Sequence, residues 1–335
     1  MLHRIVPVWL IVALGFGGCV TGSDPGVKDD SEDTGKADAW DYRNDPERFR
    51  IEFEHRLASL PREGEAEQLP WPDDYWSYYN DSINYRWRGE GQLSTAELYD
   101  VAFNGWEMPE GYMDLTPRRD RRDEWDAEYY GQLGPFASEV HRRRGNERMV
   151  NGRDDDGDGE IDECDSEDCD SIEFWWGVCH AWAPAAVMEP EPERAVEYNG
   201  VTFYPSDTKA LIMAMYDSTR AVMLGGRCNE RDVERDEEGR ATLDECQDVN
   251  AGSFHVVITN MLGRLRRAFD EDRTYDYQVW NQPIRGYEVT TLNDGLTAAQ
   301  ANQILGVEGD TYTYNSEAVS FAEVRMNVFY ITESS

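Results

Sequence analysis

The chain has 335 residues, with 68 Asp and Glu against 32 Lys and Arg, which gives a formal net charge of −36. This surplus of acid repels nucleic-acid backbones and anionic lipid head groups, so we expect no nucleic-acid partner. The length allows a sizeable core, and we expect one large folded domain behind a leader and a linker.

Residues 1–19 have the pattern of a bacterial lipoprotein signal. An apolar run at residues 5–16 leads into Gly17-Gly18-Cys19 and is too short to predict a membrane span. We therefore expect an exported protein of the cell envelope, with Cys19 lipidated and the lipid as its only membrane attachment. Phe16 departs from the usual aliphatic residue and Pro7 interrupts the run, so ordinary secretion is the alternative.

The folded domain is expected at residues 45–335, after a flexible Gly-, Ser- and Asp-rich tether at residues 20–44. Asp45-Pro46 predicts a helix start, with an apolar face formed by Phe49, Phe53, Leu57 and Leu60. Ser94 and Glu97 form a capping box that predicts a second helix. The aromatic stretch at residues 69–87 lies between them, and we expect its rings to pack in the core rather than bind a ligand.

Residues 151–170 form an acidic insert whose spacing repeats that of an EF-hand loop. Carboxylates on alternate residues can converge on one cation, Gly159 permits the turn, and Asp165 replaces the usual bidentate glutamate. We expect a structural calcium ion, and a solvated acidic insert is the alternative. The predicted ligands are Asp154, Asp156, Asp158, Glu160, Asp162 and Asp165.

The six cysteines can be sorted by their positions. Cys164 and Cys169 are near neighbours, and Cys228 and Cys246 flank a charged loop, so we expect two disulfides. A zinc site at the second pair lacks partners at metal spacing. With Cys19 processed, Cys179 remains as a thiol in an oxidising compartment, which indicates a chemical role.

Cys179 lies among tryptophans at residues 174–182, at the predicted start of a helix. A helix N-terminus supplies partial positive charge and amides that lower a thiol pKa and can hold an oxyanion. We therefore interpret Cys179 as a nucleophile. The alternative is a buried, inert cysteine in an aromatic core.

Later segments carry local structural signals. Asn199-Gly200 predicts a hairpin within residues 196–204, and Ser206 or Asp207 is expected to cap the following helix. Thr297 predicts the start of a short helix. Alternating apolar residues from Val324 to Tyr330 predict a half-buried strand.

A nucleophilic cysteine needs a base, and His255 is the best of the five histidines because it is a lone polar group in an apolar segment. A satisfied core histidine is the alternative. A carboxylate should orient the imidazole, and we favour Asp272, then Asp276.

Residues 279–289 carry Trp-Asn-Gln-Pro followed by Arg-Gly, which closely resembles the elicitor peptide of the transglutaminase elicitor family. The segments around Cys179 and His255 also look like that family's nucleophile and base segments. The resemblance covers about residue 71 to the C-terminus and implies an α+β, papain-like fold. Glu288 stands where the peptide has a lysine, which puts elicitor potency in doubt more than catalysis.

The resemblance implies a protein-glutamine gamma-glutamyltransferase. Cys179 would attack a protein glutamine, His255 would serve as acid and base, and a lysine amine would take the acyl group. Two alternatives stay open: a cysteine peptidase or glutamine deamidase on the same site, and a non-catalytic calcium-binding surface lipoprotein. The expected substrate-binding residues, which would keep the thioester dry, are Trp176, Trp182, Trp280 and Asn281.

We expect the calcium ion to stabilise the fold rather than take part in the chemistry. Chelation should therefore lower the melting temperature while some activity remains, because loss of a bound ligand lowers the stability of the native state. Thermal melting followed by circular dichroism with and without a chelator measures this effect. An unchanged melting curve would count against bound calcium.

Overall fold

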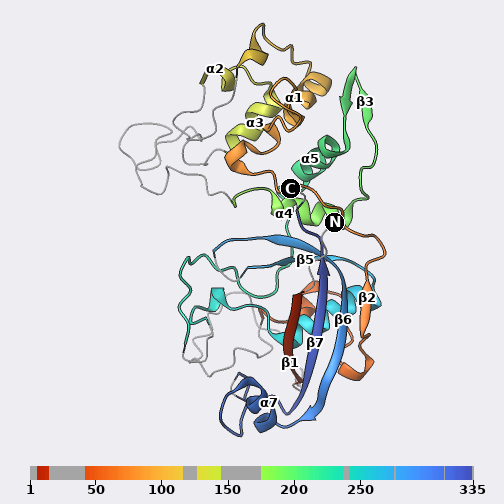
Figure 1. Ribbon diagram of the computed structural model, residues 1–335, viewed down its shortest axis with the longest axis vertical. Coiled ribbons are helices and arrows are strands. Elements are labelled where there is room, and N and C mark those ends of the chain that lie inside the picture. The colour runs from red at the N-terminus through yellow and green to blue at the C-terminus, as the bar shows by residue number, and fades with distance from the viewer. Residues whose placement is uncertain are drawn as a thin grey trace. The chain divides into compact units, whose positions relative to one another are not determined.

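The computed structural model describes residues 6–14, 42–115, 127–144, 175–236, 241–274, 277–312 and 314–333 (Figure 1). The chain forms two compact units. The sheet unit comprises Met1–Leu69 with Arg220–Ile331, and the helical unit comprises Pro70–Thr219 with Thr332–Ser335. The predicted calcium loop, together with Cys19, Cys164 and Cys169, lies outside the described residues.

The sheet unit is built on a five-stranded antiparallel sheet in the order β1-β7-β6-β2, with β5 also paired to β6. The long strands β6 and β7 lie side by side in Figure 1 and form most of the sheet. The strands are β1 (Val6–Leu14), β2 (Glu63–Glu65), β5 (Phe269–Asp272), β6 (Asn281–Leu296) and β7 (Ser320–Tyr330).

The predicted C-terminal strand is confirmed as β7. Val324, Met326 and Val328 are buried while Arg325 is exposed, as the alternation of apolar and polar residues predicts. Strand β1 pairs antiparallel with β7 and lies inside the segment that we predict to be a leader.

Helix α6 (Ala251–Ile258) packs on this sheet, with Phe254 against Val324, and continues into a π-helical turn at Thr259–Arg264. Helix α7 (Ala298–Leu305) begins after Thr297, whose hydroxyl accepts a hydrogen bond from Gln300 N–H, so this predicted cap is confirmed. In its described part the unit also has short 3₁₀ helices at Pro46–Phe49, Leu57–Ser59 and Asp244–Cys246.

The predicted long helix after Asp45-Pro46 is wrong in its length. Asp45 does cap the chain by accepting a hydrogen bond from Glu47 N–H, but the helix ends at Phe49 because Arg50 takes a left-handed conformation with φ 54°. Some of the apolar residues expected on its face still lie in the core. Phe53, for example, packs against buried residues of α6.

The disulfide predicted between Cys228 and Cys246 is confirmed, and it closes the loop that precedes α6.

The helical unit contains helices α1 (Thr95–Tyr99), α2 (Ala127–Tyr130), α3 (Pro135–Arg144), α4 (Cys179–Met188) and α5 (Pro205–Tyr216). A π-helical turn at Asp100–Asn104 follows α1, and short 3₁₀ helices lie at Tyr78–Asn80, Ser82–Asn84 and Tyr112–Asp114. No helix among the described residues is long and apolar enough to cross a membrane.

The predicted hairpin is confirmed: β3 (Val196–Tyr198) pairs with β4 (Val201–Phe203) across Asn199-Gly200, where both residues have positive φ. The predicted cap of α5 at Ser206 or Asp207 is wrong, because the helix already begins at Pro205. Asp207 lies inside the first turn and accepts a hydrogen bond from the backbone N–H of Tyr204.

The Glu97 carboxylate lies at the centre of a buried hydrogen-bond network in the helical unit. The capping box predicted at Ser94 and Glu97 is present, and the same Glu97 carboxylate also binds the buried guanidinium of Arg86 through both oxygens. Tyr112 and Tyr129 donate their hydroxyls to it. The side chains of Arg86 and Glu97 are 2% and 0% exposed, so this ion pair is saturated with hydrogen bonds away from water.

Replacing Glu97 with Ala should destabilise the helical unit severely, because Arg86 would keep a buried charge without its counter-ion. We expect a loss of about 3–5 kcal/mol in the free energy of unfolding, measured by urea denaturation. The control Glu139→Ala removes one partner of the surface pair with Arg142 and should cost less than about 1 kcal/mol. Equal losses in both variants would contradict this account.

Candidate functional site

The predicted nucleophile lies at the predicted place, because α4 begins at Cys179. Cys179 is present as a buried thiol, with 5% of its surface exposed. The preceding residue, Val178, is the N-cap and provides no side-chain hydrogen bond to the helix. The thiol therefore lies at the positive end of a helix whose first turn has no side-chain cap.

The segment before Cys179 is held by a second backbone segment of the same unit. Val178 N–H donates to the carbonyl of Tyr75 at 2.7 Å, and Tyr78 N–H donates to the carbonyl of Trp176 at 2.8 Å. Gly177 lies so close to Tyr75 that a Cβ on it would approach the Tyr75 carbonyl to 2.5 Å. A side chain at position 177 would therefore separate the two segments and displace the start of α4.

Most residues of helix α4 are buried, and apart from Trp182 these buried residues are small. The Trp182 indole is 0% exposed and donates its N–H to the carbonyl of Trp71, so it is packed inside the helical unit, and its substrate-binding role stays a prediction. Trp176 is half-buried. Pro184 falls in the second turn, and the helix continues through it.

The neighbouring His180 side chain is paired with a carboxylate. Its Nε2 lies 3.1 Å from a carboxylate oxygen of Asp217, and the side chain is exposed.

His255 lies on α6 in the sheet unit and is 2% exposed. Asn250 caps this helix by accepting from Ser253 N–H, and Asn44 accepts a hydrogen bond from Asn250 N–H. Burial lowers the pKa of His255 to about 4, so the imidazole is neutral at neutral pH. Its Nδ1 is buried and has no hydrogen-bond partner among the described residues.

Asp272 ends strand β5, and its carboxylate accepts hydrogen bonds from the backbone of Trp280 and from Thr274. No hydrogen bond joins it to His255 within the described part of the chain, and Asp276 lies outside that part. Trp280 and Asn281 are both half-buried at the start of β6. The orienting role of either aspartate and the substrate-binding roles of Trp280 and Asn281 stay predictions.

Cys179 and His255 belong to different units, each of which is described by itself. Their joint action therefore stays a prediction. Among the described residues, no three His, Cys, Asp or Glu side chains are grouped to hold a metal ion.

Comparison with known proteins decides the family. The family model for the transglutaminase elicitor matches residues 43–116 and 138–335. The chain belongs to the transglutaminase elicitor family. The resemblance of the motif at residues 279–289 is thus confirmed, and that motif runs from Trp280 into β6, where Ile284 and Tyr287 are buried.

The architecture also matches a solved structure of this kind. The crystal structure of the GP42 transglutaminase from Phytophthora sojae is similar with a TM-score of 0.55 and 28% identity, over 86% of this chain and 72% of that chain. No curated protein matches the chain. The mixed helices and antiparallel sheet confirm the predicted α+β class, with which a papain-like fold is consistent, and the chain is transglutaminase-like.

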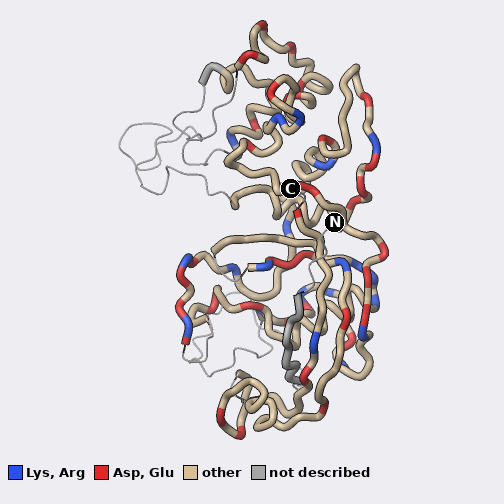
Figure 2. Tube along the Cα trace, viewed as in Figure 1, with Lys and Arg blue, Asp and Glu red and all other residues tan. Residues whose placement is uncertain are grey.

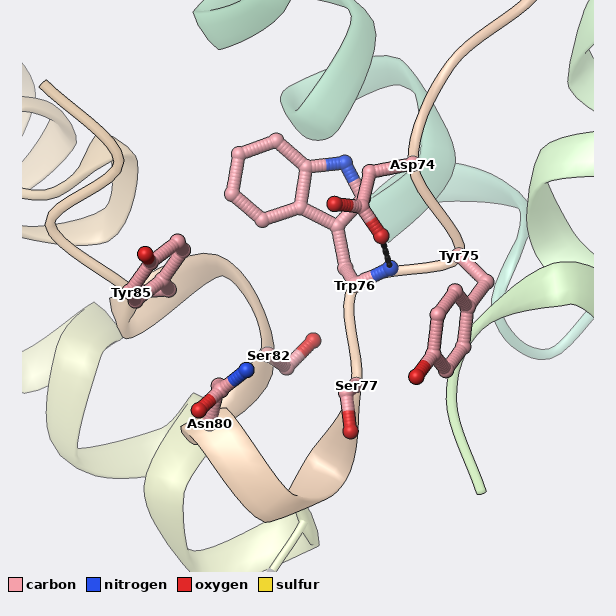
Figure 3. Close-up of a pocket in the computed structure, with 7 residues that line it drawn as sticks. All are labelled: Asp74, Tyr75, Trp76, Ser77, Asn80, Ser82 and Tyr85. Carbon is pink, nitrogen blue, oxygen red and sulfur yellow. Dashed lines mark hydrogen bonds between the residues drawn. The ribbon is translucent and has the colours of Figure 1, made fainter. Parts of the chain in front are cut away.

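The sequence did not predict a pocket that the structure forms beside the nucleophile segment. This cavity of about 130 Å³ is drawn in Figure 3. Its lining residues are Asp74, Tyr75, Trp76, Ser77, Asn80, Ser82 and Tyr85. The prediction that the rings of this aromatic stretch pack in the core is confirmed for Trp71 and Trp76, which are buried. The carboxylate of Asp74 was the sequence signal that pointed to a pocket.

The low pKa of His255 makes stability depend on pH with a definite sign. The folded-state pKa of about 4 lies below the ordinary value of 6.5, so protonation favours the unfolded chain. The neutral imidazole contributes on the order of 3 kcal/mol to the unfolding free energy above pH ~6.5. This contribution is lost as the pH falls toward ~4.

The variant His255→Gln should lose this part of the pH dependence. We expect its unfolding free energy, measured by urea denaturation from pH 4 to pH 7, to fall less steeply on acidification than that of the wild type. Identical slopes for the two proteins would show that His255 is not buried as a neutral group.

Proposed function

We propose that this protein is an active protein-glutamine gamma-glutamyltransferase with Cys179 as nucleophile and His255 as its acid and base. The observation that carries the proposal is the buried thiol at the uncapped start of α4 in a chain of the transglutaminase elicitor family. The similarity to the GP42 transglutaminase supports the same chemistry.

The first half of the proposed reaction forms a thioester. His255 takes the thiol proton, and the Cys179 thiolate attacks the side-chain carbonyl carbon of a protein glutamine. The tetrahedral intermediate collapses when the C–N bond breaks, and the imidazolium gives its proton to the departing nitrogen, which leaves as ammonia. The positive end of α4 favours the thiolate over the thiol.

The second half transfers the acyl group. A lysine amine attacks the thioester carbonyl, loses a proton to the neutral imidazole, and expels the thiolate as the isopeptide bond forms. Water in place of the amine would give glutamate, so the partition between the two acceptors decides whether the enzyme crosslinks or hydrolyses. A buried neutral imidazole suits the role of proton acceptor in both halves.

We further propose that the protein is exported and held at the envelope by a lipid on Cys19, with calcium in the acidic insert. The disulfide between Cys228 and Cys246 supports an oxidising compartment.

The proposal predicts how three variants behave in amine incorporation. Wild-type protein should couple a fluorescent primary amine to a glutamine-bearing protein whose lysines are blocked. Cys179→Ala should lose about a thousandfold or more in rate, because the nucleophile is absent. His255→Gln should lose about a hundredfold to ten-thousandfold. The matched control His180→Gln should stay within about twofold of wild type, since ordinary surface changes are small.

Other outcomes separate the alternatives. Ammonia release or cleavage without retained label would assign hydrolysis. Undiminished incorporation by Cys179→Ala would show that the nucleophile is another residue. No reaction, together with alkylation of Cys179 no faster than that of a peptide thiol, would favour the non-catalytic surface protein.

A further inference from the structure

Helix α6, which carries His255, is fastened at both ends to one N-terminal segment, residues 44–54. Asn44 is hydrogen-bonded to the first turn of the helix, and Glu54 is hydrogen-bonded to the turn that follows it. The partners Asn44 and Asn250 are 206 positions apart in the sequence, and both belong to the sheet unit. The position of the helix therefore depends on a distant part of the chain.

The Asn44 end of this arrangement is a capping box shared between two segments. In an ordinary capping box, the side chain at the third helical position returns to the backbone N–H of the N-cap residue. The third position here is Ser253, and the N-cap residue Asn250 instead donates its N–H to the Asn44 side chain at 2.7 Å. The Ser253 hydroxyl donates to the backbone carbonyl of Asn44. Asn44 thus takes the role that the third-position side chain usually has.

The residues at this end are shielded from water. Asn44, Asn250 and Ser253 are 5%, 6% and 0% exposed. A buried donor that loses its partner costs about 1–3 kcal/mol, so the N-cap amide needs an acceptor at position 44. Figure 2 shows acidic residues along both units, whereas the contacts at Asn44 join neutral amide, carbonyl and hydroxyl groups. Because salt screens charges, these contacts should not weaken at high ionic strength.

The Glu54 end holds the backbone directly after His255. Asn260 lies in the π-helical turn that follows α6 and is 0% exposed. Its Oδ1 accepts from Glu54 N–H and its Nδ2 donates to the Glu54 carbonyl, both at 2.8 Å. The same Nδ2 donates to the carbonyl of Val256. Hydrogen bonds to the N-terminal segment therefore lie on both sides of His255 along the helix.

Apolar contacts between the two ends cannot define the place of the helix by themselves. Phe53 packs with Val256 and Val257 in one buried cluster. Such contacts are non-directional, so they stabilise the packed state without defining how far the helix is shifted or rotated. Hydrogen bonds require particular distances and angles. The bonds at Asn44 and Asn260 therefore determine where α6 holds its side chains.

We propose that Asn44 is a positioning residue for the catalytic base, because it fixes α6 so that the His255 imidazole is correctly placed for proton transfer. The inference rests on the proposed acyl transfer, in which His255 moves the proton. A misplacement of about 1 Å can cost on the order of a hundredfold in rate, so a small shift of α6 is sufficient. Asn44 acts through His255 and takes no part in the chemical steps.

Substitutions at position 44 test this role in the amine-incorporation assay. Asn44→Ala removes the acceptor of the Asn250 N–H, and we expect kcat to fall about ten- to a hundredfold while KM for the glutamine donor stays within about twofold. This loss should be the same at low and high salt. Asn44→Asp keeps an acceptor oxygen and places a negative charge at a helix N-terminus, so its kcat should stay within about threefold of wild type.

The matched control is Asn302→Ala on α7. Asn302 is 0% exposed, and its side chain donates to the carbonyls of Gly309 and Thr311, so these bonds hold the loop after α7. The control should lower the stability of the sheet unit but leave kcat within about twofold of wild type. Hydrogen–deuterium exchange of the α6 amides should become faster in Asn44→Ala and stay unchanged in Asn302→Ala.

The deciding measurement is made in the His255→Gln background. If Asn44 acts through His255, Asn44→Ala should change the residual kcat there by less than about twofold, whereas a general loss of folded protein would lower activity in both backgrounds. Ser253→Ala removes a single hydroxyl and should lower kcat about two- to fivefold in the wild-type background only. This milder variant tests the inference even where Asn44→Ala folds poorly.

Equal fold-losses in the two backgrounds would overturn the inference, and so would a wild-type kcat in Asn44→Ala. An absence of both amine incorporation and ammonia release in the wild-type protein would instead overturn the proposed transferase function. In that case the exchange data decide whether Asn44 holds the helix, and unchanged exchange of α6 in Asn44→Ala would overturn that statement as well.

Discussion

Two backbone hydrogen bonds between the segment at residues 75–78 and the segment at residues 176–178 fix the start of α4. They determine where the Cys179 thiol lies, and Tyr75 and Ser77 of the first segment also line the pocket beside it. Gly177 is required between them, because any Cβ there would meet the Tyr75 backbone. The geometry of the nucleophile thus depends on a contact between residues about a hundred positions apart.

The sequence predicted those features whose cause is local. The capping box at Ser94 and Glu97 and the hairpin at Asn199-Gly200 each need only a few consecutive residues, and both are confirmed. Prediction was wrong where a neighbouring residue changed the outcome. Arg50 ended the helix that Asp45-Pro46 had started, and Pro205 moved the start of α5 ahead of Asp207.

The sequence could not predict features that arise from distant segments. It identified Cys179 and His255 by residue type and surroundings, and the structure places both on helices and buries both. It treated residues 69–87 as core because aromatic content does not reveal a cavity. Three residues of that stretch, Trp76, Asp81 and Ser82, adopt positive φ, a conformation that no propensity rule assigns to a tryptophan.

The buried polar groups of this protein fall into two kinds, and the difference bears on function. Glu97 and Asp207 are buried with several donors each, so their desolvation is offset by hydrogen bonds and ion pairs. Ser82 Oγ and His255 Nδ1 are buried with no such compensation among the described residues. Folding alone would favour an apolar side chain at position 255, so a buried imidazole there fits the proton transfer that we propose for His255.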